Sequence, residues 1–266
     1  MIKKLTLSTI LLASSLFGAN EVNVYSQRHY DSDKIIYKKF EQETGIKVNV
    51  ITAQAEELVA KLAIEGANTP ADVLITADIG NLYQAKKRHL LQPIESKILT
   101  ENVPEKLRDP DNNWFALTQR ARVFVYNPKK VNPDDLSDYL SLADPKFKDK
   151  IVTRSSTSGY NKSLLASIIA NYGEEKALAF AKGLVENMPH NPKGADKDQI
   201  IAVGAGDADI AIVNTYYLGV MLISKDKKDQ EIAKSLKIFF PAQKTTWTHM
   251  NITGAGVTNF ATNKQN

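Results

Sequence analysis

Hydrophobic positions in the first part of the chain switch between two periods. Short runs of apolar residues with the period-two or continuous pattern of strands occur at residues 21–25, 47–51 and 72–76. Segments between and after them have apolar residues at helical spacing, with polar capping residues or glycine at several ends: residues 31–44, 55–67 and 79–88. This alternation of strand and helix predicts an open, mostly parallel α/β sheet.

The alternation resumes after residues 113–117 and 122–126, which read as two strands with little room for a turn between them. Further helices are expected at 136–142, 160–172, 174–186 and 196–205, and further strands at 151–153 and 209–213. We expect one crossing between domains near residues 113–126 and a second near 241–253. This places residues 20–117 and 242–266 in a first lobe and residues 118–241 in a second lobe.

Composition is ordinary for a soluble protein, but the first nineteen residues differ from the rest. The chain has 266 residues, which favours two domains, with 43% hydrophobic and 24% charged residues. Lys3 and Lys4 precede an apolar stretch that ends in small residues, so residues 1–19 are expected to be a secretory signal peptide. The chain has no cysteine, which excludes a lipid-anchored cysteine and disulfides. We therefore expect an exported protein of the bacterial periplasm.

The net charge and the remaining histidines limit the kinds of partner and site that the sequence supports. The net charge is +4, and two of the 34 basic residues are the signal lysines, which leaves a balance near neutral and no indication of nucleic-acid binding. His89, His190 and His249 belong to no cluster, so surface or structural roles are expected. The serine-rich residues 155–159 could hold an anion at a helix start, but they lack the spacing of a P-loop and a partner that would make a serine nucleophilic. The chain is expected not to be an enzyme.

Four of the ten tyrosines follow the carboxyl ends of expected strands. Tyr30 follows His29 after the first strand, Tyr160 precedes a helix, and Tyr216 and Tyr217 are adjacent. Ligands of open α/β sheets bind at this edge. Neighbouring side chains on a helix diverge by about 100°, so both adjacent tyrosines would face a cleft only near a helix start. The alternative is that one of the pair packs in the core and the other covers the surface.

The residue types favour a hard, highly charged ion. A phenolate oxygen suits Fe³⁺ by the hard-ligand rule, and only a strongly polarising ion would displace a phenol proton whose reference pKa is about 10. His29 would add one nitrogen ligand. Four phenolates and one Fe³⁺ sum to −1, so a buried site needs a nearby cation. Arg120, beside the expected crossing, is our candidate, and the alternative is an ordinary surface or hinge arginine.

Several segments together resemble one known family. They are Tyr25–Tyr30, Ala71–Thr76, Leu117–Val123, Ser155–Asn161, Asn214–Tyr217 and His249–Val257. Over nearly the whole chain after the signal, these segments resemble the periplasmic ferric-ion-binding proteins of ABC iron transporters, which are class II periplasmic binding proteins. Within that family the chain is most similar to the tyrosine-rich branch.

The resemblance implies a two-lobed clamshell in which each lobe is a mostly parallel sheet flanked by helices and two strands cross the hinge. It implies five metal ligands: His29, Tyr30, Tyr160, Tyr216 and Tyr217. It also places Arg120 near the site. Another branch of the family carries a glutamate where this chain has Ala77, so one Fe³⁺ per chain is expected with a bound exogenous anion possible but not required.

The function implied is delivery of ferric ion to an inner-membrane ABC permease by a periplasmic monomer, with no nucleic-acid partner. The family continues with several helices past residue 266, which implies a truncated chain. The main alternative is a clamshell binding protein for an organic or oxyanion ligand, such as a polyamine, thiamine or a sulfate-like species. A periplasmic hydrolase is a third reading, for which the sequence offers no catalytic pair.

Overall fold

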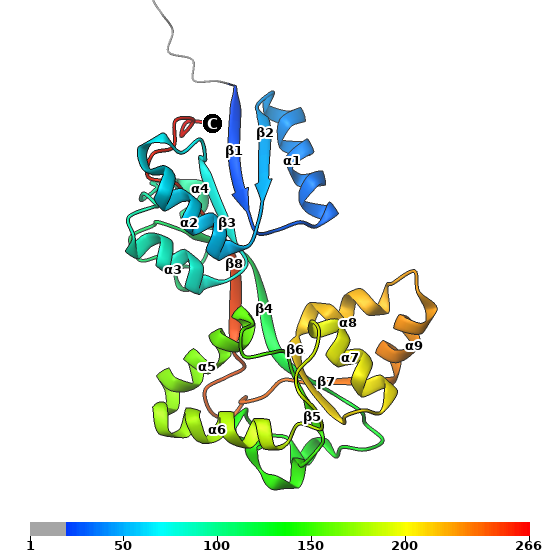
Figure 1. Ribbon diagram of the computed structural model, residues 1–266. Helices are drawn as coiled ribbons and strands as arrows, with labels where there is room; N and C mark the ends of the chain where they lie inside the picture. The colour runs from blue at the N-terminus through cyan, green and yellow to red at the C-terminus, as the bar shows by residue number, and fades with distance from the viewer. Residues whose placement is uncertain (1–19) are drawn as a thin grey trace, which may run out of the picture.

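The computed structural model describes residues 20–266 and consists of two α/β bodies joined by two long strands (Figure 1). The expected signal peptide, residues 1–19, lies outside the described residues. Among the residues described, no helix has the length and apolar character needed to cross a membrane. We call the body that contains the amino-terminal strands the first lobe and the other body the second lobe.

The first lobe follows the expected alternation closely. Its elements are β1 (Glu21–Ser26), α1 (Asp31–Thr44), β2 (Lys47–Thr52), α2 (Ala55–Glu65), β3 (Val73–Thr76), α3 (Ile79–Lys87) and α4 (Lys97–Asn102). Strand β1 pairs in parallel with both β2 and β3, so the carboxyl ends of all three strands point to the same edge. That edge faces the second lobe (Figure 1).

The two strands expected at residues 113–117 and 122–126 are one continuous strand, β4 (Phe115–Tyr126). The prediction of a break was wrong because the polar residues between them are paired with β8 (Met250–Val257). Thr118 pairs with Thr253 and Arg120 with Asn251. The strands β4 and β8 run antiparallel to each other and cross between the lobes (Figure 1).

The second lobe contains the rest of the sheet, whose overall order is β2-β1-β3-β8-β4-β6-β5 with β7 paired to β4. Its elements are β5 (Ile151–Val152), α5 (Gly159–Tyr172), α6 (Glu174–Glu186), α7 (Asp196–Ala205), β6 (Ile210–Asn214), α8 (Thr215–Leu222), α9 (Lys227–Ser235) and β7 (Lys237–Phe239). Parallel pairing in this lobe is confined to β5 and β6, because β4 enters from the hinge and runs antiparallel to β6 and β7.

The prediction of a helix at residues 136–142 was also wrong. The chain forms only short 3₁₀ turns there, including one at Leu140–Ala143. Leu136, Tyr139 and Leu142 are all buried in one hydrophobic cluster, so their apolar pattern reflects packing against that cluster rather than a continuous helix.

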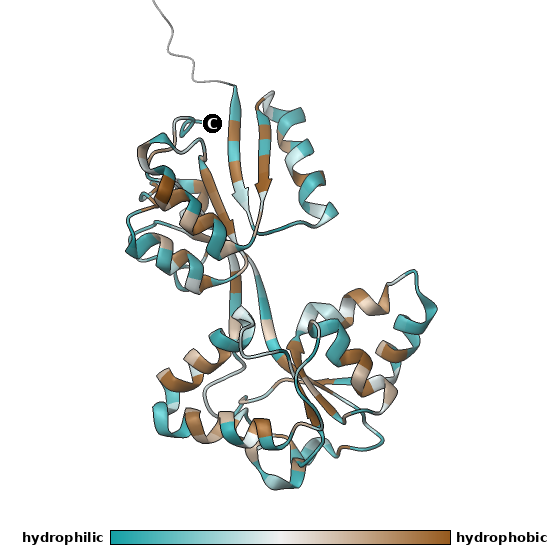
Figure 2. Ribbon diagram, in the orientation of Figure 1, coloured by the Kyte–Doolittle hydropathy of each residue, from teal (hydrophilic) through white to brown (hydrophobic). Residues whose placement is uncertain are grey.

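Strand β4 also separates the two hydrophobic clusters of the second lobe. Phe124 and Tyr126 belong to the cluster under α5 and α6, whereas Val123 and Val125 belong to the cluster under α7, α8 and α9. This alternation is the period of two expected of a strand buried on both faces. Hydrophobic residues concentrate on the strands and on inward helix faces, which leaves the outer helix faces polar (Figure 2). Each lobe therefore has its own core and presents its strand ends to the other.

Candidate metal centre

Three of the sequence-predicted site residues meet at the strand ends of the second lobe. Strands β5 and β6 are parallel, so α5 and α8 both begin at the same edge. Tyr160 is the second residue of α5, and Tyr216 is the second residue of α8. Their hydroxyl oxygens are 3.4 Å apart. The fold thus converts two separate strand–helix junctions into one cluster of phenols.

Tyr216 and Tyr217 both belong to this cluster. Their rings stack with centroids 4.3 Å apart and an interplanar angle of 29°. Both side chains are half-buried, so neither is a purely surface residue, although Tyr217 also packs against the apolar cluster under α7 to α9. Because both lie in the first turn of α8, the pair avoids the divergence that consecutive residues show farther along a helix.

His29 and Tyr30 lie on the first lobe, between β1 and α1. Their rings stack at 4.9 Å, and the guanidinium of Arg28 lies over the Tyr30 ring at 5.4 Å from its centroid. Both residues are exposed, unlike the half-buried phenols of the second lobe. The two lobes therefore present unequal parts of the predicted site: three half-buried phenols on one side and an exposed imidazole–phenol pair on the other.

Burial keeps the phenols of α8 protonated. Loss of water contact is the largest cause that raises the pKa of Tyr217, to about 12, and the charges of Tyr160, Asp196 and Tyr30 raise it further. The pKa of Tyr216 is raised well above its ordinary value by burial first and then by Tyr160. A ligand that binds these oxygens as phenolates must displace their protons.

Three arginines surround the Tyr160 ring. Their guanidinium carbons lie 5.1 Å (Arg120), 5.9 Å (Arg122) and 5.3 Å (Arg154) from its centroid. Arg120 is a buried residue of the crossing strand β4, and it donates a hydrogen bond to the carbonyl of Ala77 in the first lobe. The three guanidinium groups place positive charge beside the phenol cluster.

Conventional metal ligands do not gather elsewhere. In residues 20–266, no group of three or more His, Cys, Asp or Glu side chains is placed to hold a metal ion. The candidate ligands are thus divided between the lobes: Tyr160, Tyr216 and Tyr217 lie on the second lobe, and His29 and Tyr30 lie on the first.

Comparisons with known proteins identify the family of the chain. Residues 68–248 match the model of the family described as bacterial extracellular solute-binding protein. The chain belongs to this family. Among curated relatives, it is 49% identical over 245 residues to iron uptake protein A1 of Synechocystis, with 92% of this chain and 68% of that protein covered. It is 31% identical over 223 residues to the major ferric iron-binding protein of Neisseria meningitidis, covering 80% of this chain and 66% of that protein.

Comparison with solved structures also identifies similar iron-binding proteins. The ferric binding protein from Campylobacter jejuni superposes with a TM-score of 0.88 at 50% identity, covering 92% of this chain and 78% of that one. A Trichodesmium protein solved in complex with iron and citrate ligands gives a TM-score of 0.86 at 45% identity, with the same coverage. The chain spans about two thirds of the length of its curated relatives. The expected two-lobed α/β fold is confirmed, and family membership confirms a binding protein rather than an enzyme.

This solute-binding protein also contains site residues that the sequence analysis did not identify. Asp196, at the start of α7, is fully buried and forms an ion pair with Arg122. A nitrogen of the Arg154 guanidinium lies 3.6 Å from the other carboxylate oxygen of Asp196. Asp196 thus holds two of the three arginines that surround Tyr160. The one sequence signal was the pair of arginines two residues apart, and therefore on one face, of strand β4.

Of the histidines set aside earlier, His249 lies beside the site and the other two do not. His89 and His190 are exposed. The ring of His249 is half-buried, with Nε2 3.4 Å from the Ser163 hydroxyl. Burial, followed by the charges of Arg122 and Arg120, lowers the pKa of His249 to about 4. A neutral imidazole next to two arginines fits a structural role.

Proposed function

We propose that this solute-binding protein is the ferric-ion receptor of an iron importer, with His29, Tyr30, Tyr160, Tyr216 and Tyr217 as its metal ligands. The observation that carries the proposal is the 3.4 Å contact between the Tyr160 and Tyr216 hydroxyls, with the Tyr217 ring stacked beside them. The names of the relatives, an iron uptake protein and a ferric iron-binding protein, support the same cargo.

The charge of the proposed site is compatible with Fe³⁺ as the bound ion. Four phenolates and one ferric ion leave a charge of −1, which is costly to bury alone. The guanidinium groups of Arg120 and Arg154 lie within 5.3 Å of the Tyr160 ring centroid and offset that charge. Because the protein itself supplies five ligands, one ion per chain binds without needing an exogenous anion.

The lobes act in sequence. We assign residues 20–117 and 242–266 to the first lobe and residues 118–241 to the second, with β4 and β8 as the hinge. The second lobe offers three half-buried phenols next to arginines, whereas His29 and Tyr30 are exposed. The ion therefore binds the second lobe first, and His29 and Tyr30 complete the shell when the lobes close, as in hinge closure around a ligand.

We infer the delivery of the ion to a permease from membership of this family. The chain is a member of an extracellular solute-binding family, and we infer that it works as a monomer in the periplasm, after removal of residues 1–19. It would hand its ion to an ABC permease of the inner membrane. No nucleic-acid partner is part of this function.

The test is colour. Ferric ion bound by phenolates absorbs visible light by charge transfer, so the protein should become coloured when ferric citrate is added and excess chelate is removed. Tyr216→Phe and Tyr217→Phe should each weaken the band, whereas Tyr83→Phe, at an exposed tyrosine of α3, should leave it unchanged. A colourless protein, or a band unaffected by both α8 variants, would sink the proposal and favour an organic or oxyanion ligand.

A further inference from the structure

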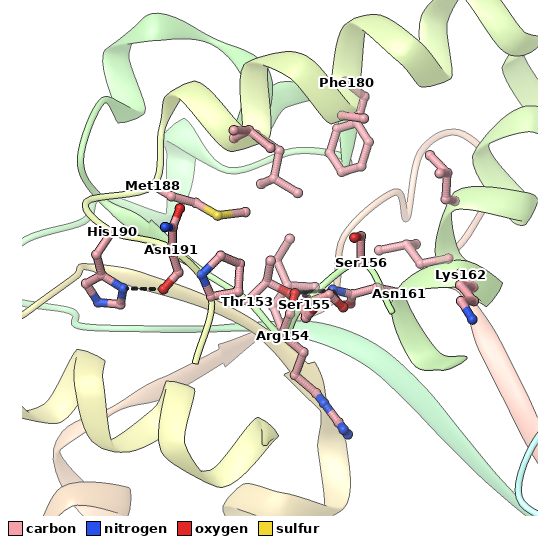
Figure 3. A pocket seen from close by; sticks show the side chains of 17 residues that line it. Thr153, Arg154, Ser155, Ser156, Asn161, Lys162, Phe180, Met188, His190 and Asn191 are labelled. Carbon is pink, nitrogen blue, oxygen red and sulfur yellow. Dashed lines mark hydrogen bonds between the residues drawn. The ribbon is translucent and has the colours of Figure 1, made fainter. Parts of the chain in front are cut away.

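The second lobe contains a cavity of about 510 Å³ that is separate from the tyrosine cluster (Figure 3). It lies between α5, α6 and the segment that joins α6 to α7, next to the loop that follows β5. Its volume falls within the range of small-molecule sites, about 300–1,000 Å³. The proposed metal site does not use it.

One side of the cavity is apolar. That side is formed by residues of α5, α6 and β6 together with one methionine: Leu164, Leu165, Phe180, Leu184, Met188 and Ile212. In Figure 3, Phe180 and Met188 lie across the cavity from Ser155, Ser156 and Asn161. The cavity therefore has an apolar side and a polar side, which suits a ligand with an apolar body and one polar end.

The Lys, Arg, Asp and Glu residues that line the cavity are all cationic: they are Arg154 and Lys162. Lys162 is exposed, and in the part of the chain that the structure describes no hydrogen bond or ion pair engages its ammonium, so the ammonium is free to pair with an incoming anion. The polar end of the ligand should therefore be an anion.

Arg154 separates this cavity from the metal site. Its backbone belongs to the cavity wall, but its guanidinium extends away from Phe180 and Met188 (Figure 3) and lies over the Tyr160 ring, 3.6 Å from Asp196. Asn161, also in the wall, is occupied by hydrogen bonds to the Arg154 carbonyl at 2.6 Å and from Arg122 at 2.7 Å. The wall thus directs its arginine toward the phenols and leaves Lys162 as the cation of the cavity.

From this arrangement we infer that the cavity is a second ligand site, for a small carboxylate with an apolar chain or ring. The apolar body packs against Phe180, Leu184 and Met188, and the carboxylate lies toward Lys162 and the hydroxyls of Ser155 and Ser156. This site is independent of the ferric-ion proposal, because its lining includes none of the five proposed metal ligands.

The experiment uses hexanoate as the probe on the metal-free, chelator-treated protein, with hexanol and hexylamine as chains of matched length. Binding is followed by isothermal titration and by chemical-shift changes in the protein. Hexanoate should bind saturably and more tightly than hexanol, and hexylamine should bind least. Lys162→Gln should weaken hexanoate by about two- to fivefold, as expected for one exposed ionic contact, while Lys228→Gln on α9 serves as the matched control and should have no effect.

The variant Val185→Trp tests whether hexanoate binds in this cavity. Val185 lines the cavity yet is 66% exposed on α6, so the larger ring can enter the mouth without disturbing the core. This variant should keep the circular dichroism of the parent and lose saturable hexanoate binding. Absence of saturable binding, equal binding of the three probes, or hexanoate binding unchanged in Val185→Trp would each overturn the inference, and none of these results would bear on the colour test for iron.

Discussion

The hydroxyl oxygens of Tyr160 and Tyr216 lie 3.4 Å apart although the two residues are separated by 56 positions in the chain. Tyr216 does not ionise easily there, because burial first and then the neighbouring Tyr160 raise its pKa, and two phenolates at this distance would repel each other. A trivalent cation placed between the oxygens removes that repulsion. The contact is therefore more readily explained as half of a metal shell than as packing.

Tyr160→Phe should weaken ferric binding while leaving the fold intact. The change removes one phenol oxygen and keeps the ring between the arginines, so affinity should fall by at least the roughly 10–100-fold seen when a supporting group of a metal site is lost. Competition with a chelator of known strength measures the change. The matched control is Tyr172→Phe at the end of α5, whose hydroxyl contacts Thr245 and Thr246 instead. Equal affinities for the two variants would remove Tyr160 from the shell.

Metal binding should release protons and weaken in acid. The pKa of Tyr217 is raised to about 12, and that of Tyr216 is also raised, so both phenols carry their protons at neutral pH. Each phenol that becomes a phenolate releases one proton, so apparent affinity should fall about tenfold per pH unit for each such group as pH decreases.

Proton release can be counted directly. When ferric citrate is added in weakly buffered solution, Tyr217→Phe should release about one proton fewer than the parent protein. Tyr83→Phe should release as many as the parent. If Tyr217→Phe released the full number, Tyr217 would not bind the metal as a phenolate.

The sequence was sufficient to predict those parts of the site that depend on the local order of strands and helices. Tyr160 and Tyr216 each follow a strand, and parallel pairing of β5 with β6 is enough to bring such positions to one edge. These features follow from patterns within a few residues of each other.

The remaining features depend on contacts between distant segments. Strand β4 continues through polar residues because β8, more than a hundred residues later, supplies its hydrogen-bond partners. The Arg122–Asp196 ion pair joins residues 74 positions apart, and nothing near Asp196 marks it as buried, since it reads as an ordinary acidic residue in a helix first turn. Long-range pairing of this kind leaves no periodic signal in one sequence.

Breaking the Arg122–Asp196 pair should destabilise the metal-free protein strongly. The two side chains are 1% and 0% exposed, and Arg122 also donates to Asn161. Removing Arg122 leaves the buried Asp196 carboxylate with only the longer 3.6 Å contact to Arg154, and breaking a buried ion pair typically costs about 3–5 kcal/mol. Arg122→Met should therefore lower the free energy of unfolding by that order in urea titrations.

The double variant Arg122→Met/Asp196→Leu should regain most of the loss, because no fully buried charge is left; Arg154, which also loses its contact with Asp196, is 28% exposed and keeps contact with water. As a control, Lys97→Met breaks an ion pair with Glu101 whose side chains are 86% and 62% exposed, and should cause no measurable change. A double variant no more stable than Arg122→Met would show that the cost comes from lost packing rather than from an isolated charge.

His249 should make the stability of the metal-free protein depend on pH in a defined window. Its pKa in the folded protein is about 4, below the ordinary value of 6.5, because burial and the charges of Arg122 and Arg120 disfavour the imidazolium. Between those two values the unfolded chain binds more protons than the folded one, so the free energy of unfolding falls as pH falls. This loss of stability is absent above about pH 6.5 and reaches roughly 3 kcal/mol by pH 4.

The measurement is urea unfolding at pH 7.5 and pH 4.5 with a chelator present, for the parent protein, His249→Gln and His190→Gln. All three lose stability in acid through their carboxylates, so the difference between them isolates the histidine. His190 is exposed and its variant should follow the parent. His249→Gln should lose about 2–3 kcal/mol less than the parent over this interval, because its side chain cannot gain a proton on unfolding. Parallel losses in the parent and His249→Gln would mean that the imidazole beside the arginines is already charged in the folded protein.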